Sequence, residues 1–317
     1  MKDKIRGAVV GVAIGDSLGM PVESLHPKTI RKYFKWVNSY RVPNKKTRTF
    51  HNLKRGQWTD DTQLTLAIGE SIVEKNNIDY EDIANKHINL YLHSQRGWGR
   101  ATRNGVENIM NLVNWWDAGD KNAAGNGVVM KIAPIGILYG LGKINTIEMI
   151  TICSNIAKMT HKDERAILGT IIHCRLIDIA LNSGFDVLKT YLVDLSIITD
   201  SLEDYDQNAL SDRLELIGPN ICDLGDNDIR RLFGAGAFIN ESLPFTYAMI
   251  YKYGGNLQDC IERIVNQGGD SDTNASIAAS LLGACYGYSG FPAKWRKGLE
   301  ERVRLINLAD RLMEVRL

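Results

Sequence analysis

Two short runs of oxygen-bearing side chains are the residues of this chain best suited to chemistry. The first run is Thr59, Asp60 and Asp61, and the second extends from Asp270 to Thr273. The Asp-x-Asp spacing of the second run lets alternate side chains converge, and its threonine adds a neutral oxygen. Hard cations such as Mg²⁺ prefer oxygen ligands of this kind, and no cysteine or histidine near the second run offers a softer ligand. The second run therefore suits a site for a divalent cation, and the first run offers ligands of the same kind.

Each run also has an interpretation that involves no metal. Thr59 is placed to be the N-cap of a helix, with Asp60 and Asp61 in a first turn where the helix dipole favours acids. Taken alone, the first run is more typical of such a helix start. The second run follows Gly268 and Gly269, which permit a tight turn that aims several oxygens at one point. That turn favours a ligand site.

Two other kinds of site use an Asp-x-Asp pattern. An EF-hand requires glycine at loop position six and glutamate at position twelve, where this chain has Ala275 and Leu281, so this class is excluded. A phosphatase-type nucleophilic aspartate normally follows a buried strand. Residues 259–267 instead have the apolar spacing of an amphipathic helix. A metal-dependent phosphohydrolase is therefore disfavoured but stays open.

Glycine-rich loops offer a second kind of site. Residues 125–127 read Gly-Asn-Gly and precede an apolar segment, residues 128–141, that could begin a helix. Free backbone N–H groups at such a start would bind an anion. Residues 97–100, Gly-Trp-Gly-Arg, form a second loop suited to a phosphate or a sugar. Either loop alone is more typical of a simple turn.

Helices are the elements expected to position these residues. Leu64, Ala67, Ile68 and Ile72 recur as one helical face directly after the first acidic run, and similar stripes follow elsewhere. Because no strand–turn–strand or strand–helix–strand pattern is present, we predict an all-α fold of about a dozen helices around a buried centre. We expect one domain over residues 1–317, with residues 38–57 as a surface loop and residues 200–228 as peripheral helix and loop.

Four glycines share one face of the first expected helix. Gly7, Gly11, Gly15 and Gly19 are four residues apart, and each interior glycine costs about 1 kcal/mol relative to alanine. Close packing against another helix is the preferred explanation, and residues 275–287 are similarly rich in small side chains. The alternative is a backbone brought close to a ligand at the end of the helix.

Composition limits the classes of partner. With 38 basic and 37 acidic residues, the net charge of +1 does not indicate a nucleic-acid or membrane partner, although it does not exclude a nucleic-acid acceptor.

The five cysteines are dispersed and form no CxxC pair, so we expect reduced thiols and a cytoplasmic location. Residues 7–15 imitate a signal sequence, but no small-x-small cleavage site follows, and no uninterrupted apolar run approaches about 20 residues.

Four motifs, in this order along the chain, resemble the ADP-ribosylglycohydrolase family. They are residues 15–23 (GDSLGMPVE), 58–62 (WTDDT), 125–127 (GNG) and 268–273 (GGDSDT). The resemblance implies a compact orthogonal all-α fold with a central dinuclear metal cleft, two Mg²⁺ or Mn²⁺ ions, and hydrolysis that releases ADP-ribose from a modified acceptor. Some members are crystallin-like, so a non-catalytic ADP-ribose binder or a structural relative is the alternative.

The resemblance also implies roles for individual residues. The metal ligands would be Thr59, Asp60, Asp61, Asp270, Asp272 and Thr273. Asp272 would bridge the two ions, and Asp61 and Asp272 would act in catalysis together with Glu23, whose carboxylate would position water or exchange a proton with the leaving group. The substrate contacts would come from Gly99, Asn126, Gly127, His161 and Phe238.

Two positions depart from the family pattern. Phe238 stands where the family often has an adenine-stacking tyrosine, which keeps the ring face and loses the hydroxyl. Lys131 replaces a usual arginine, so a point charge replaces a fork-shaped guanidinium. The implied partner is an ADP-ribosylated protein or small molecule, with arginine as the first acceptor to test. Serine and a nucleic-acid base stay open as acceptors.

Overall fold

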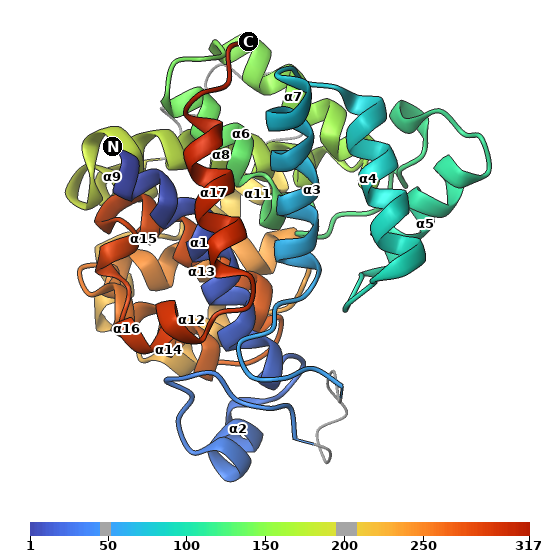
Figure 1. Ribbon diagram of the computed structural model, residues 1–317. Helices are drawn as coiled ribbons and strands as arrows, with labels where there is room; N and C mark the ends of the chain where they lie inside the picture. Colours follow the sequence, from blue (N-terminus) through green and yellow to red (C-terminus); the bar gives the residue numbers. More distant parts are fainter. Residues whose placement is uncertain (45–51, 195–207) are drawn as a thin grey trace.

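The chain is built of helices that surround a central pair (Figure 1). The computed structural model describes residues 1–44, 52–194 and 208–317, and in these ranges it has no strand, only two isolated β-bridges. The all-α prediction is therefore confirmed. The α-helices are α1 (Lys2–Gly19), α2 (Pro27–Phe34), α3 (Asp60–Lys75), α4 (Tyr80–His93), α5 (Arg100–Met110), α6 (Ala133–Gly140), α7 (Thr146–Lys158), α8 (Glu164–Ser183), α9 (Phe185–Val193), α11 (Asn208–Leu214), α12 (Asp226–Phe233), α13 (Ile239–Tyr253), α14 (Leu257–Asn266), α15 (Ser271–Tyr286), α16 (Ala293–Gly298) and α17 (Arg302–Leu312). Short 3-10 helices are η1 (Met20–Val22), η2 (Trp115–Asp117), η3 (Val129–Lys131), η4 (Pro219–Asp223) and η5 (Tyr288–Gly290).

The central pair is α1 and α15, which lie against each other along most of their length (Figure 1). A Cβ placed on Gly7, Gly11 or Gly15 would lie only 2.1 to 2.3 Å from a backbone oxygen of α15. Only glycine permits this approach of two backbones. The row of glycines therefore serves close helix packing, as preferred from the sequence, and it fixes the end of α1 beside the start of α15.

The start of α15 is anchored in the same way. A Cβ on Gly19 would lie 2.3 Å from the carbonyl oxygen of Ser271, whose hydroxyl donates a 2.9 Å hydrogen bond to the carbonyl oxygen of Gly19. α14 ends at Asn266, so a helix and not a strand precedes the Gly-Gly turn. This arrangement disfavours the phosphatase-type aspartate, as expected.

Within the part of the chain that the structure describes, two helices are long and apolar enough to cross a membrane by length and composition alone. They are the segments Lys2–Val22 and Glu164–Ser183, of which 94% and 72% of the apolar window is already buried inside the protein. The interior of the protein covers most of the apolar surface of both helices, as it does for core helices.

The two segments predicted to lie on the surface, residues 38–57 and 200–228, differ in their helix content. Residues 35–44 and 52–57 have no helix in the described part, and residues 45–51 lie outside it. In the 200–228 region, residues 200–207 lie outside the described residues, and α11, η4 and the start of α12 follow. The cysteines are all free, as expected, although Sγ of Cys153 and Sγ of Cys174 are 3.4 Å apart in the core.

Candidate active site

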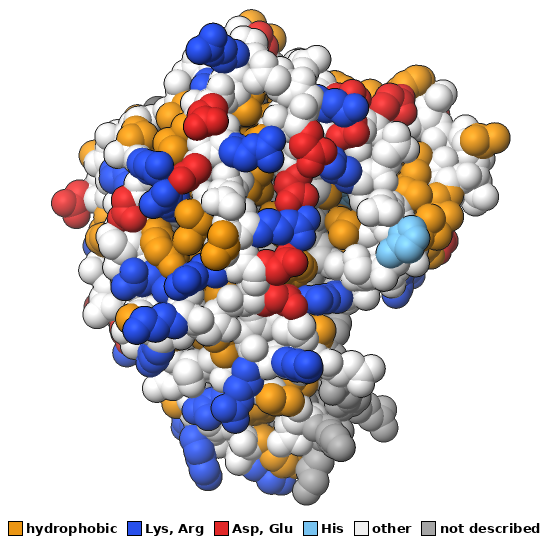
Figure 2. Space-filling view, in the orientation of Figure 1, with side chains coloured by type: hydrophobic (Ala, Val, Ile, Leu, Met, Phe, Trp, Pro, Cys, Tyr) orange, Lys and Arg blue, Asp and Glu red, His pale blue; other side chains and the backbone are white. Residues whose placement is uncertain are grey.

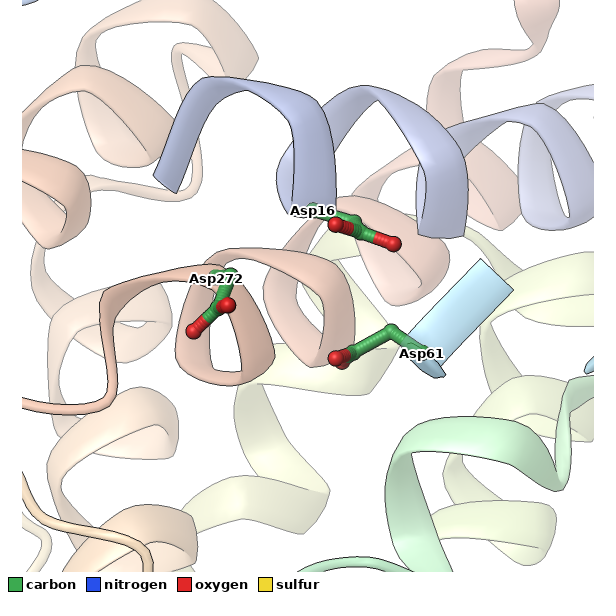
Figure 3. A group of neighbouring side chains, drawn as sticks. All are labelled: Asp16, Asp61 and Asp272. Atoms are coloured by element: carbon green, nitrogen blue, oxygen red, sulfur yellow. The ribbon is translucent and has the colours of Figure 1, made fainter. Parts of the chain in front are cut away.

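Acidic side chains from three helices converge at the end of the central pair. Asp16 comes from the last turn of α1, Asp61 from the first turn of α3 and Asp272 from the first turn of α15, and all three point into one space (Figure 3). Each offers a carboxylate oxygen within 4.8 Å of the others. A second group with the same spacing consists of Glu23, Asp270 and Asp272. Asp272 is common to both groups.

Asp16 organises the start of α3. Its carboxylate accepts hydrogen bonds from the backbone N–H of Thr59 at 2.8 and 2.9 Å and of Thr62 at 3.1 Å. It also accepts from the hydroxyls of Thr59 at 2.9 Å and Thr62 at 2.6 Å. Thr59 occupies the N-cap position, as the sequence suggested, but the side chain of Asp16 does the capping. Both oxygens of Asp16 are thus occupied by donors from α3.

The carboxylate of Asp61, unlike that of Asp16, is not fully hydrogen-bonded. It is fully buried, and its Oδ1 has no hydrogen-bond partner. A buried carboxylate oxygen without a donor is costly unless a cation or a proton satisfies it. Burial, and then the carboxylates of Asp16 and Asp60, raise the pKa of Asp61 well above its usual range. This orphaned oxygen fits a metal ligand, whereas the saturated oxygens of Asp16 fit a positioning group.

Residues from other parts of the chain hold the second run in place through hydrogen bonds to Asp270. The Asp270 N–H donates to the carbonyl oxygen of Ala235 at 2.8 Å, and its carboxylate accepts from the side-chain amide of Asn126 at 2.6 Å. The Asn126 amide also lies 2.9 Å from the Ser242 hydroxyl, which donates to Asn274 at 2.6 Å. This chain of hydrogen bonds orients Asp270 toward the cleft. Asn126, which the resemblance implies as a substrate contact, lines the cleft and also supports an acid of the second run.

Hydroxyl and carboxylate oxygens of the two runs meet at Thr273. Its hydroxyl lies 3.4 Å from Oδ2 of Asp61 and 3.9 Å from the sulfur of Met130. Thr59 and Asp61 lie behind the cleft with no exposed surface, while Thr273 and Asp272 are nearly buried and line it. The two runs, more than 200 residues apart in sequence, therefore form one oxygen-lined floor.

Glu23 stands at the edge of this floor. Burial, and then the carboxylates of Asp270 and Asp60, raise its pKa to about 8. Burial and the Asp16 carboxylate likewise raise the pKa of Asp60 to about 7. Glu23 directly follows η1, and the next residue, Ser24, donates its N–H to the carbonyl oxygen of Gly269 at 2.6 Å. The chain around Glu23 is thus fastened to the Gly-Gly turn.

The floor opens into a cleft of about 440 Å³, a volume suited to a small ligand. The residues predicted as site residues that line it are Glu23, Asp60, Gly99, Asn126, Gly127, His161, Phe238, Asp270, Asp272 and Thr273. Gly99 is the N-cap of α5, and its N–H lowers the pKa of Asp60. The two glycine-rich loops thus lie on one cleft, but the Asn126 N–H already donates to Ala237 and is not free for an anion.

The far walls of the cleft carry two rings. His161 follows α7, and its ring packs so closely on Gly127 that a Cβ there would lie 2.8 Å from it. Burial, and then the Lys131 ammonium, lower the pKa of His161 to about 3, so the ring is neutral. Phe238 is 39% exposed at the rim, with the Arg165 guanidinium 5.3 Å from the centre of its ring.

Lys131 lies under the site and does not line the cleft. It is fully buried, and its ammonium nitrogen is 3.4 Å from Nε2 of His87. The opposite ring nitrogen of His87 lies 2.8 Å from the Ile83 carbonyl oxygen and must donate to it, so Nε2 accepts from the lysine. Burial lowers the pKa of Lys131 to about 7, while Asp60 opposes the change. Lys131 thus interacts electrostatically with Asp60 from behind the cleft.

The donor set of the floor fits divalent cations. It consists of buried carboxylates and hydroxyls, it includes the unpartnered Oδ1 of Asp61, and no sulfur or imidazole ligand belongs to either carboxylate group. The two carboxylate groups found among the described residues share Asp272. The fold and the cleft define an all-α protein with an acidic, oxygen-lined ligand site.

Comparison with known proteins identifies the family of this fold and cleft. The family model described as ADP-ribosylglycohydrolase matches residues 1–317. The ADP-ribosyl-[dinitrogen reductase] glycohydrolase of Rhodospirillum rubrum is 26% identical over 95% of this chain and 92% of its own length. The ADP-ribosylarginine hydrolase Tri1 of Pseudomonas putida is 26% identical over 98% of this chain and 78% of its own. A solved structure titled "ADP-ribosylglycohydrolase-related protein complex" superposes with a TM-score of 0.79 at 26% identity, covering 100% and 99% of the two chains. The chain belongs to the ADP-ribosylglycohydrolase family.

Proposed function

We propose that the protein is an ADP-ribosyl glycohydrolase that requires two Mg²⁺ ions and releases ADP-ribose from an ADP-ribosylated arginine side chain of a protein. The observation that supports it most is the floor of the cleft, where Asp61 presents an unpartnered oxygen and Asp272 belongs to two carboxylate groups. The relatives named above support the substrate class, because their names specify ADP-ribosylarginine and an ADP-ribosylated protein. A cytoplasmic location and a single domain over residues 1–317 complete the proposal.

The residues expected to hold the ions are Thr59, Asp60, Asp61, Asp270, Asp272 and Thr273. Bound divalent cations would hold the vicinal ribose hydroxyls and polarise water; Mn²⁺ is the alternative ion. The chain supplies the remaining chemistry. The carboxylates of the floor favour the positive charge that develops at the anomeric carbon as the bond to the acceptor breaks.

Glu23 is the residue proposed to move the proton. As a carboxylate it would take a proton from the attacking water, whose oxygen forms the new bond to the anomeric carbon. The electrons of the broken carbon–nitrogen bond stay with the arginine guanidine, and Glu23 then returns the proton to that nitrogen. In the absence of cations its pKa is about 8, so it holds a proton at neutral pH. The charge of bound cations favours the carboxylate form that the reaction needs.

The remaining residues of the cleft are proposed to bind the rest of ADP-ribose. Phe238 offers a ring face at the rim for the adenine, and Gly99, Gly127 and His161 line the space between the rim and the acids. His161 is neutral and can donate or accept a hydrogen bond without adding charge. In this proposal the ribose lies over the acids and the acceptor lies beside Glu23.

Glu23→Gln tests this assignment. The variant should bind ADP-ribose and Mg²⁺ as the wild type does and lose about 100-fold or more in single-turnover cleavage. Glu148→Gln is the matched control, because Glu148 closes a capping box on α7 that glutamine also satisfies. Unchanged single-turnover cleavage by Glu23→Gln would remove Glu23 from the mechanism.

One set of ADP-ribosylated substrates tests both the identity of the acceptor and the metal requirement. Arginine-, serine- and nucleic-acid-linked ADP-ribose are each incubated with the enzyme, with and without EDTA. We expect release of ADP-ribose from the arginine linkage alone, abolished by EDTA and restored by Mg²⁺. Binding without release would indicate a non-catalytic binder, and inorganic phosphate released from simple esters would indicate a phosphohydrolase.

A further inference from the structure

The segment that follows Glu23 carries a concentration of positive charge. Helix α2 and its C-cap contain four cations and no acid; they are Lys28, Arg31, Lys32 and Lys35. All four are exposed, and no ion pair to any of them is found in the described ranges. In Figure 2, blue side chains gather at the lower end of the molecule, where Figure 1 places α2. A protein of net charge +1 has therefore placed unneutralised charge on one short helix.

A groove runs between α2 and α12. It has a volume of about 400 Å³, and its titratable lining residues are His26, Lys28, Arg31, Arg230 and Arg231, with no carboxylate. An adjoining hollow of about 360 Å³ shares Pro27, Arg31 and Asn227 with it. The helices that form the groove are about 200 residues apart in sequence, so the fold has gathered these cations.

The acids near the groove are already occupied. Asp226 accepts from Arg263 at 3.0 Å and from the Tyr253 hydroxyl at 2.5 Å, and Asp228 pairs with Arg231 and caps the Gly225 N–H. These contacts leave Lys28 and Arg31 without a counter-charge in the described structure. A groove of this kind attracts anions, most strongly at low ionic strength.

The groove adjoins the catalytic cleft. Glu23 lines the cleft, whereas His26 and Pro27 line the groove, and four residues of chain span at most about 14 Å. Between them, the Ser24 N–H donates to the Gly269 carbonyl oxygen at 2.6 Å, and the Gly269 N–H donates to the Leu25 carbonyl oxygen at 3.0 Å. The cleft and the groove are thus lined by the two ends of one fastened segment, residues 23–27.

We propose that this groove, through Lys28 and Arg31, binds acidic residues of the acceptor protein that flank the ADP-ribosylated side chain; this rests on the proposed function. An extended peptide whose modified residue lies at Glu23 reaches the groove with a residue about four positions away. Protein is favoured over nucleic acid because the relatives act, by name, on an ADP-ribosylated protein and on ADP-ribosylarginine. The groove would add selectivity among acceptors without touching the bond that breaks.

The test compares the wild type with Lys28→Glu/Arg31→Glu on three ADP-ribosylated arginine peptides. These carry acidic, amide or lysine residues up to four positions from the modified arginine, and free ADP-ribosylarginine is the fourth substrate. We expect the double variant to lose about tenfold or more in kcat/KM on the acidic peptide, with the loss shrinking as salt is raised. Its rate on free ADP-ribosylarginine should stay within twofold, and it should gain on the lysine peptide.

Lys297→Glu/Arg311→Glu, which reverses two exposed cations on α16 and α17, controls for net charge and should change none of these rates. Equal rates of wild type and groove variant on the acidic and lysine peptides would overturn the proposal. Equal losses on all four substrates would also overturn it, because they indicate a disturbed cleft. ADP-ribosylated nucleic acid is added as a fifth substrate, and a loss confined to it would overturn the proposal and assign the groove to nucleic acid. If the wild type cleaves none of the substrates, the proposed glycohydrolase function itself fails.

Discussion

Gly15→Ala tests whether the backbone contact between α1 and α15 sets the geometry of the acidic site. A Cβ at this position would lie 2.2 Å from the backbone oxygen and 2.3 Å from the backbone carbon of Ala275. Real Cβ atoms do not come closer than 3.0 Å, so the two backbones must move apart by at least 0.8 Å there. Asp16 is the next residue on α1, and Asp272 lies one turn before Ala275 on α15.

The expected loss has two parts. Overpacking costs about 1–3 kcal/mol, and the gain in helix propensity returns about 1 kcal/mol, so stability should fall by up to about 2 kcal/mol. Activity should fall more, because a displacement near 1 Å between catalytic groups costs about 100-fold. We therefore expect a folded variant with weakened Mg²⁺ binding and about 100-fold lower kcat.

Gly69→Ala is the matched control. Gly69 also lies inside a helix, but a Cβ there meets only the flexible end of the Leu308 side chain at 2.9 Å. It should keep wild-type activity. The assays are urea unfolding, Mg²⁺ titration and single-turnover cleavage of ADP-ribosylarginine. If Gly15→Ala keeps the Mg²⁺ affinity and kcat of Gly69→Ala, the backbone contact does not set the site and the reasoning is wrong.

Two further predictions concern the cations. Asp272→Asn should lower activity more than Asp60→Asn, because Asp272 belongs to both carboxylate groups and would serve both ions; equal, modest losses rescued by excess Mg²⁺ would argue against bridging. Mg²⁺ affinity should rise between pH 6 and 8, because raised pKa values of about 8 for Glu23 and about 7 for Asp60 mean that protons must leave as a cation binds. Calorimetry in buffers of different ionisation enthalpy measures those protons, and a flat affinity without proton release would contradict the prediction.

Much of the fold and of the floor could be predicted from the sequence, because those signals are local. The stripe from Leu64 to Ile72 gives α3, and Gly7 and Gly11 one turn apart give a close helix contact. The two acidic runs are recognisable because each is continuous. Their meeting across more than 200 residues followed only from the family resemblance, since spacing within a run carries no information about distant partners.

Asp16 was missed as an organising residue for the same reason. Its partners, Thr59 and Thr62, are 43 and 46 residues away, and although Asp16 lies in the motif of residues 15–23, no role was predicted for it. The hydrogen bond from the Asn126 amide to Asp270 could not be predicted either, because it depends on tertiary contact. The groove could not be predicted either, because its cations come from α2 and α12.

The contact between α1 and α15 contributes both to the stability of the fold and to the geometry of the acidic site. Clustering buried carboxylates is unfavourable, as the raised pKa values of Asp61 and Asp272 indicate, so the fold must hold them against their repulsion. The α1–α15 contact does this with backbone atoms, whose positions vary less than those of side chains. Asp16 then carries that rigidity to the start of α3 through its bonds to Thr59 and Thr62. The spacing between the acidic runs is therefore set before any cation binds, which is the arrangement expected of a preorganised site.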